Sequence, residues 1–122
     1  METKEIAKQL VGMCNQGDFD KPYETLYSKD IVSIENDGTG EGAMAKGFEE
    51  IQKKGEWWNE TYKVHACKVA EPTVADNWFT TKFEMDVTHN PSGQRSTFSE
   101  IAVYEVQNGK IVKEQFFYDQ QE

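Results

Sequence analysis

Two strand-like runs meet at an Asn108-Gly109 pair near the end of the chain, and this junction constrains the fold more than any other feature. The runs cover residues 97–106 and 111–118 and are rich in β-branched and aromatic side chains. An Asn-Gly pair suits a two-residue turn, because both central positions of that turn need a positive φ angle. The sequence therefore predicts a β-hairpin in the last quarter of the chain.

The first part of the chain predicts a pair of helices. Thr3 is expected to cap the first helix and Gly17 to end it. Asp20 as the N-cap and Pro22 in the first turn predict a second, shorter helix. The apolar positions at helical spacing are Ile6, Leu10, Val11 and Cys14 in the first helix and Phe19, Tyr23, Leu26 and Tyr27 in the second.

A strand, a turn and a third helix are predicted next. Residues 31–35 are mostly β-branched, and the turn formers at 36–40 follow them directly. From residue 44 to about residue 59 apolar side chains return at near-helical spacing, although Gly55 weakens the pattern. The residues that define this third helix are Met44, Phe48, Ile51 and Trp58.

From Tyr62 onward the apolar pattern alternates every second residue. It predicts a strand at 62–69, and a following strand with Phe79, Thr81, Phe83, Met85 and Val87 on one face. Pro72 and the cluster at 90–93 separate these runs. With the last hairpin they make a mostly antiparallel sheet of about five or six strands. We therefore predict an α+β fold, a single domain over residues 1–122, with three helices covering one face of a curved sheet.

The charge of the chain bears on its partners. Its 122 residues include 22 acidic and 13 basic side chains, which give a net charge of −9. This charge repels phosphate backbones and anionic membrane surfaces, so neither nucleic acid nor a membrane is an expected partner. The first residues lack the pattern of a signal peptide, and no window reaches the roughly 20 apolar residues of a membrane span. We expect a soluble, cytoplasmic protein.

The residue types that usually hold metals or cofactors form no recognisable set. Cys14 and Cys67 have neither metal-binding nor redox spacing and are expected to be buried free thiols. His65 and His89 match no zinc motif and are expected to be surface or structural residues. The glycines at 38–42 follow a strand without the rest of a nucleotide-binding motif. No metal and no cofactor are therefore expected.

Several short motifs, in order along nearly the whole chain, resemble a known family. They are Asn15-Gln-Gly-Asp18, residues 26–35, Gly42 before the long helix, residues 108–112 and Phe117-Tyr-Asp119. Together they resemble the SnoaL-like family of the nuclear transport factor 2-like superfamily, whose fold is shared by ketosteroid isomerases and polyketide cyclases. The resemblance implies a cone-shaped barrel with a small-molecule pocket between the concave sheet face and the helices. It also implies a homodimer formed through the opposite sheet face.

The resemblance allows a comparison with the proton-transfer groups of the isomerases. Their general base falls on Glu35, which keeps a carboxylate. Their oxyanion-hole tyrosine falls on Leu10, and their protonated aspartic acid falls on Ala102, or on Val103 in an alternative alignment. Since none of these three side chains can donate a hydrogen bond, isomerisation by that apparatus is not expected.

A different polar set is expected in the pocket. If Ala102 faces inward, strand alternation turns Glu100 inward with it. On the last strand the comparison turns Glu114 inward, although a one-residue bulge would exchange it for Gln115. The expected ligand-binding residues, beside the catalytic candidates Glu35 and Glu100, are Leu10, Trp58, Phe98, Ala102, Tyr104, Glu114, Phe116 and Tyr118.

Carboxyl groups gathered in an aromatic cavity push their pKa values apart, which leaves one as a base and another as an acid near neutral pH. We predict a cofactor-independent enzyme of the isomerase, cyclase or dehydratase type, acting on an apolar or carbonyl-containing substrate. Glu35 is the expected base and Glu100 the partner acid or orienting group. The alternatives are a non-catalytic module for a small ligand such as an amine or polyol, and a dimeric interaction module. Glu35, Glu100 and Glu114 can also be read as ordinary exposed carboxylates.

Overall fold

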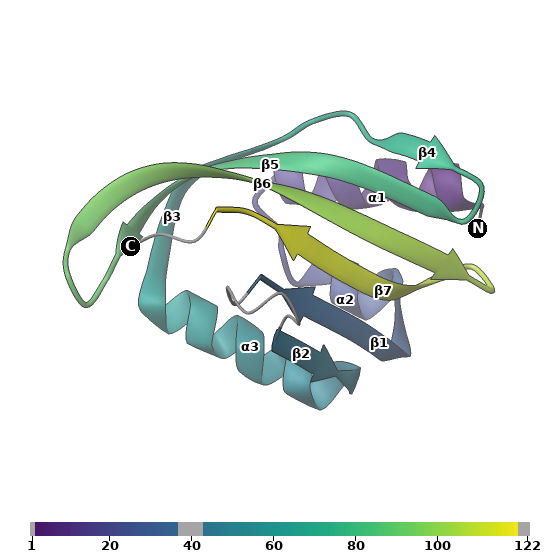
Figure 1. Cartoon of the computed structure of the whole chain (residues 1–122), viewed down its shortest axis with the longest axis horizontal. Coiled ribbons are helices and arrows are strands. Elements are labelled where there is room, and N and C mark those ends of the chain that lie inside the picture. The colour runs from purple at the N-terminus through teal and green to yellow at the C-terminus, as the bar shows by residue number, and fades with distance from the viewer. Residues whose placement is uncertain (1, 37–42, 120–122) are drawn as a thin grey trace.

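The computed structural model describes residues 2–36 and 43–119, and in it three helices lie on one side of a curved sheet (Figure 1). The helices are α1 (Thr3–Asn15), α2 (Lys21–Thr25) and α3 (Gly47–Thr61). The strands are β1 (Tyr27–Glu35), β2 (Ala43–Lys46), β3 (Tyr62–Val69), β4 (Thr73–Ala75), β5 (Trp78–His89), β6 (Gln94–Gln107) and β7 (Lys110–Phe117). The predicted α+β architecture is confirmed.

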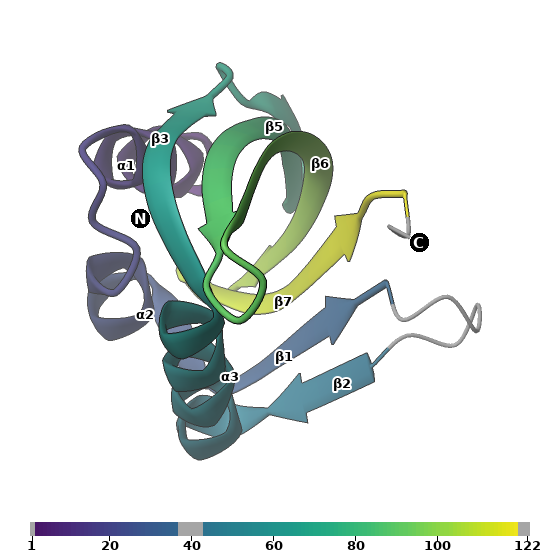
Figure 2. The same cartoon turned by 90° about the vertical axis from the view of Figure 1, so that its left-hand side faces the viewer.

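The strands follow the order β2-β1-β7-β6-β5-β3, with β4 paired to β5. Neighbouring strands are antiparallel except β1 and β7, which run parallel. The sheet curls without closing, and α3 lies beside its two edge strands, β2 and β3 (Figure 2). The described residues therefore form seven strands, because the short strands β2 and β4 add to the predicted number.

The predicted hairpin is present between β6 and β7. Asn108 and Gly109 have φ angles of 52° and 74°, as the two-residue turn requires. Strands β6 and β7 pair on either side of it, beginning with Gln107 opposite Lys110. The register shifts near the turn, where Glu105 and Val106 of β6 face Lys113 and Ile111, so β7 has one extra residue there. Beyond this bulge Glu114 faces the cavity, as predicted.

The core lies between the sheet and α1. Ile6, Ala7, Leu10 and Cys14 form the buried face of this helix and pack against the inward side chains of β5. Full burial of an Ile or Leu side chain stabilises the fold by about 1.5–3 kcal/mol. The five alternating residues predicted for β5 are all buried. Thr3 is the first residue of α1 and not its cap, since Glu2 occupies that position without a side-chain bond to the helix.

The helix predicted to begin at Met44 is wrong in its first turn. Residues 43–46 form β2, which pairs with the end of β1, and the helix begins at Gly47. Gly47 has a φ of 78°, which an L-residue adopts only with strain, so the glycine permits the sharp change from strand to helix. Met44 and Phe48 are exposed, and Ile51 and Trp58 alone of the four predicted residues pack toward the core.

The remaining differences concern the limits of elements. Strand β1 begins at Tyr27, four residues earlier than predicted, because the chain leaves α2 at Leu26 and pairs at once with β7. Of the predicted turn cluster at 36–40 only Asn36 is described, and Gly42 lies outside the described residues. Within residues 2–36 and 43–119, no helix is long and apolar enough to cross a membrane.

Candidate functional site

A cavity of about 1500 Å³ lies between the concave sheet face and the helices. Small-molecule sites usually enclose about 300–1,000 Å³, so this space can hold a ligand of several fused rings. Every predicted site residue except Ala102 borders the cavity. Ala102 faces the same side of the sheet but is fully buried in the core, opposite Thr81 of β5.

Glu35, at the end of β1, is held by two neighbours. Its Oε1 lies 2.6 Å from Lys54 Nζ, and its Oε2 accepts a hydrogen bond of 2.9 Å from the Tyr118 hydroxyl. Lys54 Nζ also donates to Ser33 Oγ at 2.7 Å and lies 4.9 Å from the centre of the Phe116 ring. The carboxylate that the sequence predicts as the base is therefore already engaged by a cation and a phenol.

Glu100, on β6 opposite Phe83 of β5, has a different environment. Within the described part of the chain its carboxyl group has no hydrogen-bond or ion-pair partner. Burial raises its pKa to about 7, the nearby Glu35 carboxylate adds to this rise, and Lys54 opposes it. A carboxyl group with this pKa changes protonation state near neutral pH, as a general acid or base must.

Glu114, on β7, is fully buried and has three hydroxyl neighbours. Tyr23 donates to its Oε1 at 3.2 Å and Tyr27 to its Oε2 at 2.5 Å, and Ser33 also bonds to the carboxyl group. Burial raises its pKa above the usual range, although Lys54 and the three hydroxyls oppose the rise. The alternative of an exposed Glu114 is therefore wrong.

Aromatic rings form one wall of the cavity. The Trp58 ring stacks on Tyr62, with their centres 4.4 Å apart, and meets the edge of Phe98 at 6.3 Å. Trp57, the next residue on α3, also borders the cavity but is 58% exposed. Such a wall favours flat, apolar ligands.

Sequence reasoning missed the partners of the carboxyl groups: Lys54, Ser33, Tyr23 and Tyr27. Lys54 had a usable signal, because it lies three residues after Ile51 on the face of α3 that turns inward. The sequence offers no usable signal for Tyr27. Its spacing predicts the end of the second helix, whereas it is the first residue of β1.

The thiols do not add a nucleophile to the site. Cys14 and Cys67 are free, as predicted, with Cys14 buried and Cys67 half-buried. Burial raises their pKa values to about 12 and about 11, so both remain protonated at neutral pH. Among residues 2–36 and 43–119, no group of three His, Cys, Asp or Glu side chains is placed to hold a metal ion.

The raised pKa of Glu100 predicts how stability depends on pH. The folded chain binds this proton more tightly than the unfolded chain does, so stability is lost as pH rises from about 4.5 to about 7. The loss from Glu100 is at most about 3 kcal/mol. We expect Glu100→Gln to reduce the fall in unfolding free energy between pH 5 and pH 8, measured by urea denaturation. The raised pKa of Glu114 also lowers stability as pH rises, but it does so equally in the wild type and in Glu100→Gln. Parallel pH profiles of unfolding free energy in the two proteins would contradict the prediction.

An open, curled sheet with three helices over its concave face and a cavity between them defines the nuclear transport factor 2-like class of folds. A family model described as a SnoaL-like domain matches residues 1–118. The chain belongs to the SnoaL-like family.

Solved structures agree with this assignment. A candidate SnoaL-like polyketide cyclase from Mesorhizobium loti is 36% identical, with a TM-score of 0.89 over 97% of this chain and 100% of that one. A nuclear transport factor 2-like protein from Burkholderia thailandensis is 17% identical, with a TM-score of 0.83 over 98% and 92%. A ketosteroid isomerase-like protein from Catenulispora acidiphila, solved with trimethylamine, is 16% identical, with a TM-score of 0.74 over 96% and 87%. The last two show the fold alone. No curated protein matches the chain.

Proposed function

We propose that the protein is a cofactor-independent acid–base enzyme that moves a proton next to a carbonyl group of an apolar, polycyclic substrate. The observation that carries this proposal is the carboxyl group of Glu100. It lies without a partner among the described residues, its pKa is about 7, and it borders an aromatic cavity that also contains a lysine.

In the proposed reaction Glu100 removes a proton from the carbon beside the carbonyl group. The C–H bond breaks, its electron pair moves into an enolate, and the proton resides on Glu100 until it returns to another carbon. This assigns the base to Glu100, whereas the sequence favoured Glu35. Glu35 is a poorer base here, because Lys54 and Tyr118 occupy both of its oxygens.

Lys54 is the proposed stabiliser of the enolate. An ammonium group has three N–H donors, and Glu35 and Ser33 engage two of those on Lys54. The third remains available to a developing negative charge, and a cation held in position stabilises such charge. This lysine offers the donor that Leu10 and Ala102 cannot provide.

Native mass spectrometry and thermal-shift measurements with steroid-like, polyketide-like and small polar carbonyl compounds test the proposal. We expect apolar ketones to raise the melting temperature. Proton NMR in D₂O is then expected to reveal exchange of the hydrogens beside their carbonyl group. Ketones that bind but never exchange would leave only a binding function.

A non-catalytic binding module is the second candidate. An amine could pair with the Glu100 carboxylate and contact the Trp58 and Phe98 rings. The Catenulispora relative was solved with trimethylamine, which is a precedent within the fold and not evidence for this chain. A native ligand that is recovered chemically unaltered supports this candidate over the enzyme.

We further propose a homodimer that forms through the outer sheet face. Ile101 and Phe117 are paired there on adjacent strands, with exposures of 51% and 48%, and Trp78 on β5 is also exposed. The same native mass spectra give the mass of the assembly. If only the monomer is found at micromolar concentration, the homodimer is rejected. A cytoplasmic location is proposed from the two free thiols, and cell fractionation tests it.

A further inference from the structure

Tyr104 differs from Tyr23 and Tyr27, the two tyrosines that bond to Glu114. Its ring stacks on Phe79 with the centres 4.6 Å apart and the planes at 15°, and the residue is only 2% exposed. Tyr23 and Tyr27 both donate their hydroxyl hydrogens to Glu114. Among the described residues, the Tyr104 hydroxyl has no hydrogen-bond partner. A buried hydroxyl without a partner carries a desolvation cost, so its presence needs an explanation.

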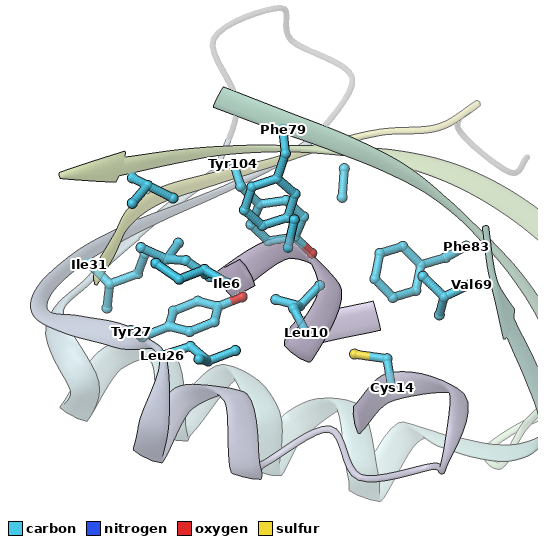
Figure 3. Close-up of a cluster of buried hydrophobic side chains, with 14 of the residues drawn as sticks. Ile6, Leu10, Cys14, Leu26, Tyr27, Ile31, Val69, Phe79, Phe83 and Tyr104 are labelled. Carbon is cyan, nitrogen blue, oxygen red and sulfur yellow. The ribbon is translucent and has the colours of Figure 1, made fainter. Parts of the chain in front are cut away.

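The free hydroxyl of Tyr104 faces the cavity. No fully enclosed side-chain oxygen or nitrogen of the described residues lacks a hydrogen-bond partner, so the unpartnered Tyr104 oxygen must touch open space. Tyr104 is one of the residues that border the cavity, and in Figure 3 its oxygen points away from the sheet. The hydroxyl is therefore placed to meet a molecule that enters this space.

The surroundings determine what the hydroxyl can bind. Burial, followed by the charge of Glu114, raises the pKa of Tyr104 well above its usual value, so the group stays protonated and can donate. Glu100 also lies near enough to contribute to this rise. Two carboxyl groups nearby disfavour an anionic ligand. Leu10 and Phe83, which border the same cavity, favour an apolar one.

We propose that Tyr104 is a ligand-binding and specificity residue, whose hydroxyl donates a hydrogen bond to an uncharged oxygen acceptor on an otherwise apolar ligand. The acceptor is a ketone, ester or ether oxygen, and a carboxylate is rejected at this position. This inference rests on the proposed carbonyl substrate and specifies how its oxygen, or a second oxygen of the same ligand, is recognised.

Three probes with one apolar body test the proposal: 2-acetylnaphthalene, 2-ethylnaphthalene and 2-naphthoate. Calorimetry of the wild type is expected to give about tenfold tighter binding of the ketone than of the hydrocarbon. It is also expected to give the weakest binding for the carboxylate. Tyr104→Phe is expected to bind ketone and hydrocarbon equally, with the hydrocarbon affinity unchanged within about twofold.

Tyr62→Phe is the matched control, because Tyr62 is another tyrosine that borders the cavity and the change keeps its ring on Trp58. It is expected to keep the ketone preference. Tyr104→Phe should fold at least as stably as the wild type, since the lost hydroxyl has no partner among the described residues. Thermal unfolding without ligand checks this.

Retention of the ketone preference in Tyr104→Phe, or failure of all three probes to bind the wild type, would overturn the assignment. The proposed enzyme function is tested independently of this binding role. If the ketone preference depends on Tyr104 while no bound ketone exchanges its hydrogens, the binding role stands and the proton-transfer role of Glu100 does not.

Discussion

Glu100→Gln is expected to lower kcat/KM for hydrogen exchange beside the substrate carbonyl by about 10²–10⁴-fold, because a general base normally contributes that much. The amide of Gln keeps the size of the side chain but cannot accept the proton. The carboxyl group has no partner among the described residues, so its loss breaks no contact that holds the cavity. NMR exchange rates of wild type and variant, with the same ketone at several concentrations, measure the effect.

The pH dependence identifies the group that titrates. A base must be deprotonated, so the wild-type rate should rise with pH and level off above a pKa of about 7. Glu35→Gln is the matched control. It leaves Glu100 in place and is expected to lower the rate by only about tenfold, through weaker positioning of Lys54. If Glu35→Gln were the more damaging change, the base would be Glu35, as the sequence predicts.

The sequence predicted the second half of the fold better than the first. Strand alternation in β5 and the Asn108-Gly109 turn depend on local chemistry, and both are confirmed. The error at Met44 arose because β2 is a short edge strand whose existence depends on pairing with β1, a contact distant in sequence. Gly47 marked the boundary, but its positive φ is visible only in the structure.

The site was predictable where one strand supplies it. Glu100 and Tyr104 border the cavity because alternation on β6 turns them to the same side. The roles of the carboxylates were not predictable. They depend on Lys54, which reaches Glu35 from a helix that the sequence does not place against β1. Strand alternation therefore predicted which side chains face inward. Which carboxylate lacks a partner among the described residues depends on tertiary contacts.

Glu114→Leu is expected to lower the free energy of unfolding by about 3–5 kcal/mol at pH 7, measured by urea denaturation. Leucine fits a fully buried position but accepts no hydrogen bond. The change leaves the hydroxyls of the buried Tyr27 and the half-buried Tyr23 unpaired, and each buried unpaired group costs about 1–3 kcal/mol. Glu114→Gln is the matched control, because its amide oxygen still accepts a hydrogen bond, and it is expected to cost less than about 1.5 kcal/mol.

The two phenols decide whether this cost comes from lost hydrogen bonds or from poor packing of leucine. Removing both hydroxyls as well, in the triple variant Tyr23→Phe, Tyr27→Phe and Glu114→Leu, leaves no unpaired group from these three side chains. Replacing all members of a buried polar cluster by apolar groups is often neutral or stabilising, whereas removing one member is costly. We therefore expect the triple variant to recover most of the stability lost in Glu114→Leu. A triple variant that is less stable than Glu114→Leu would show that packing around residue 114, and not its hydrogen bonds, stabilises this part of the core.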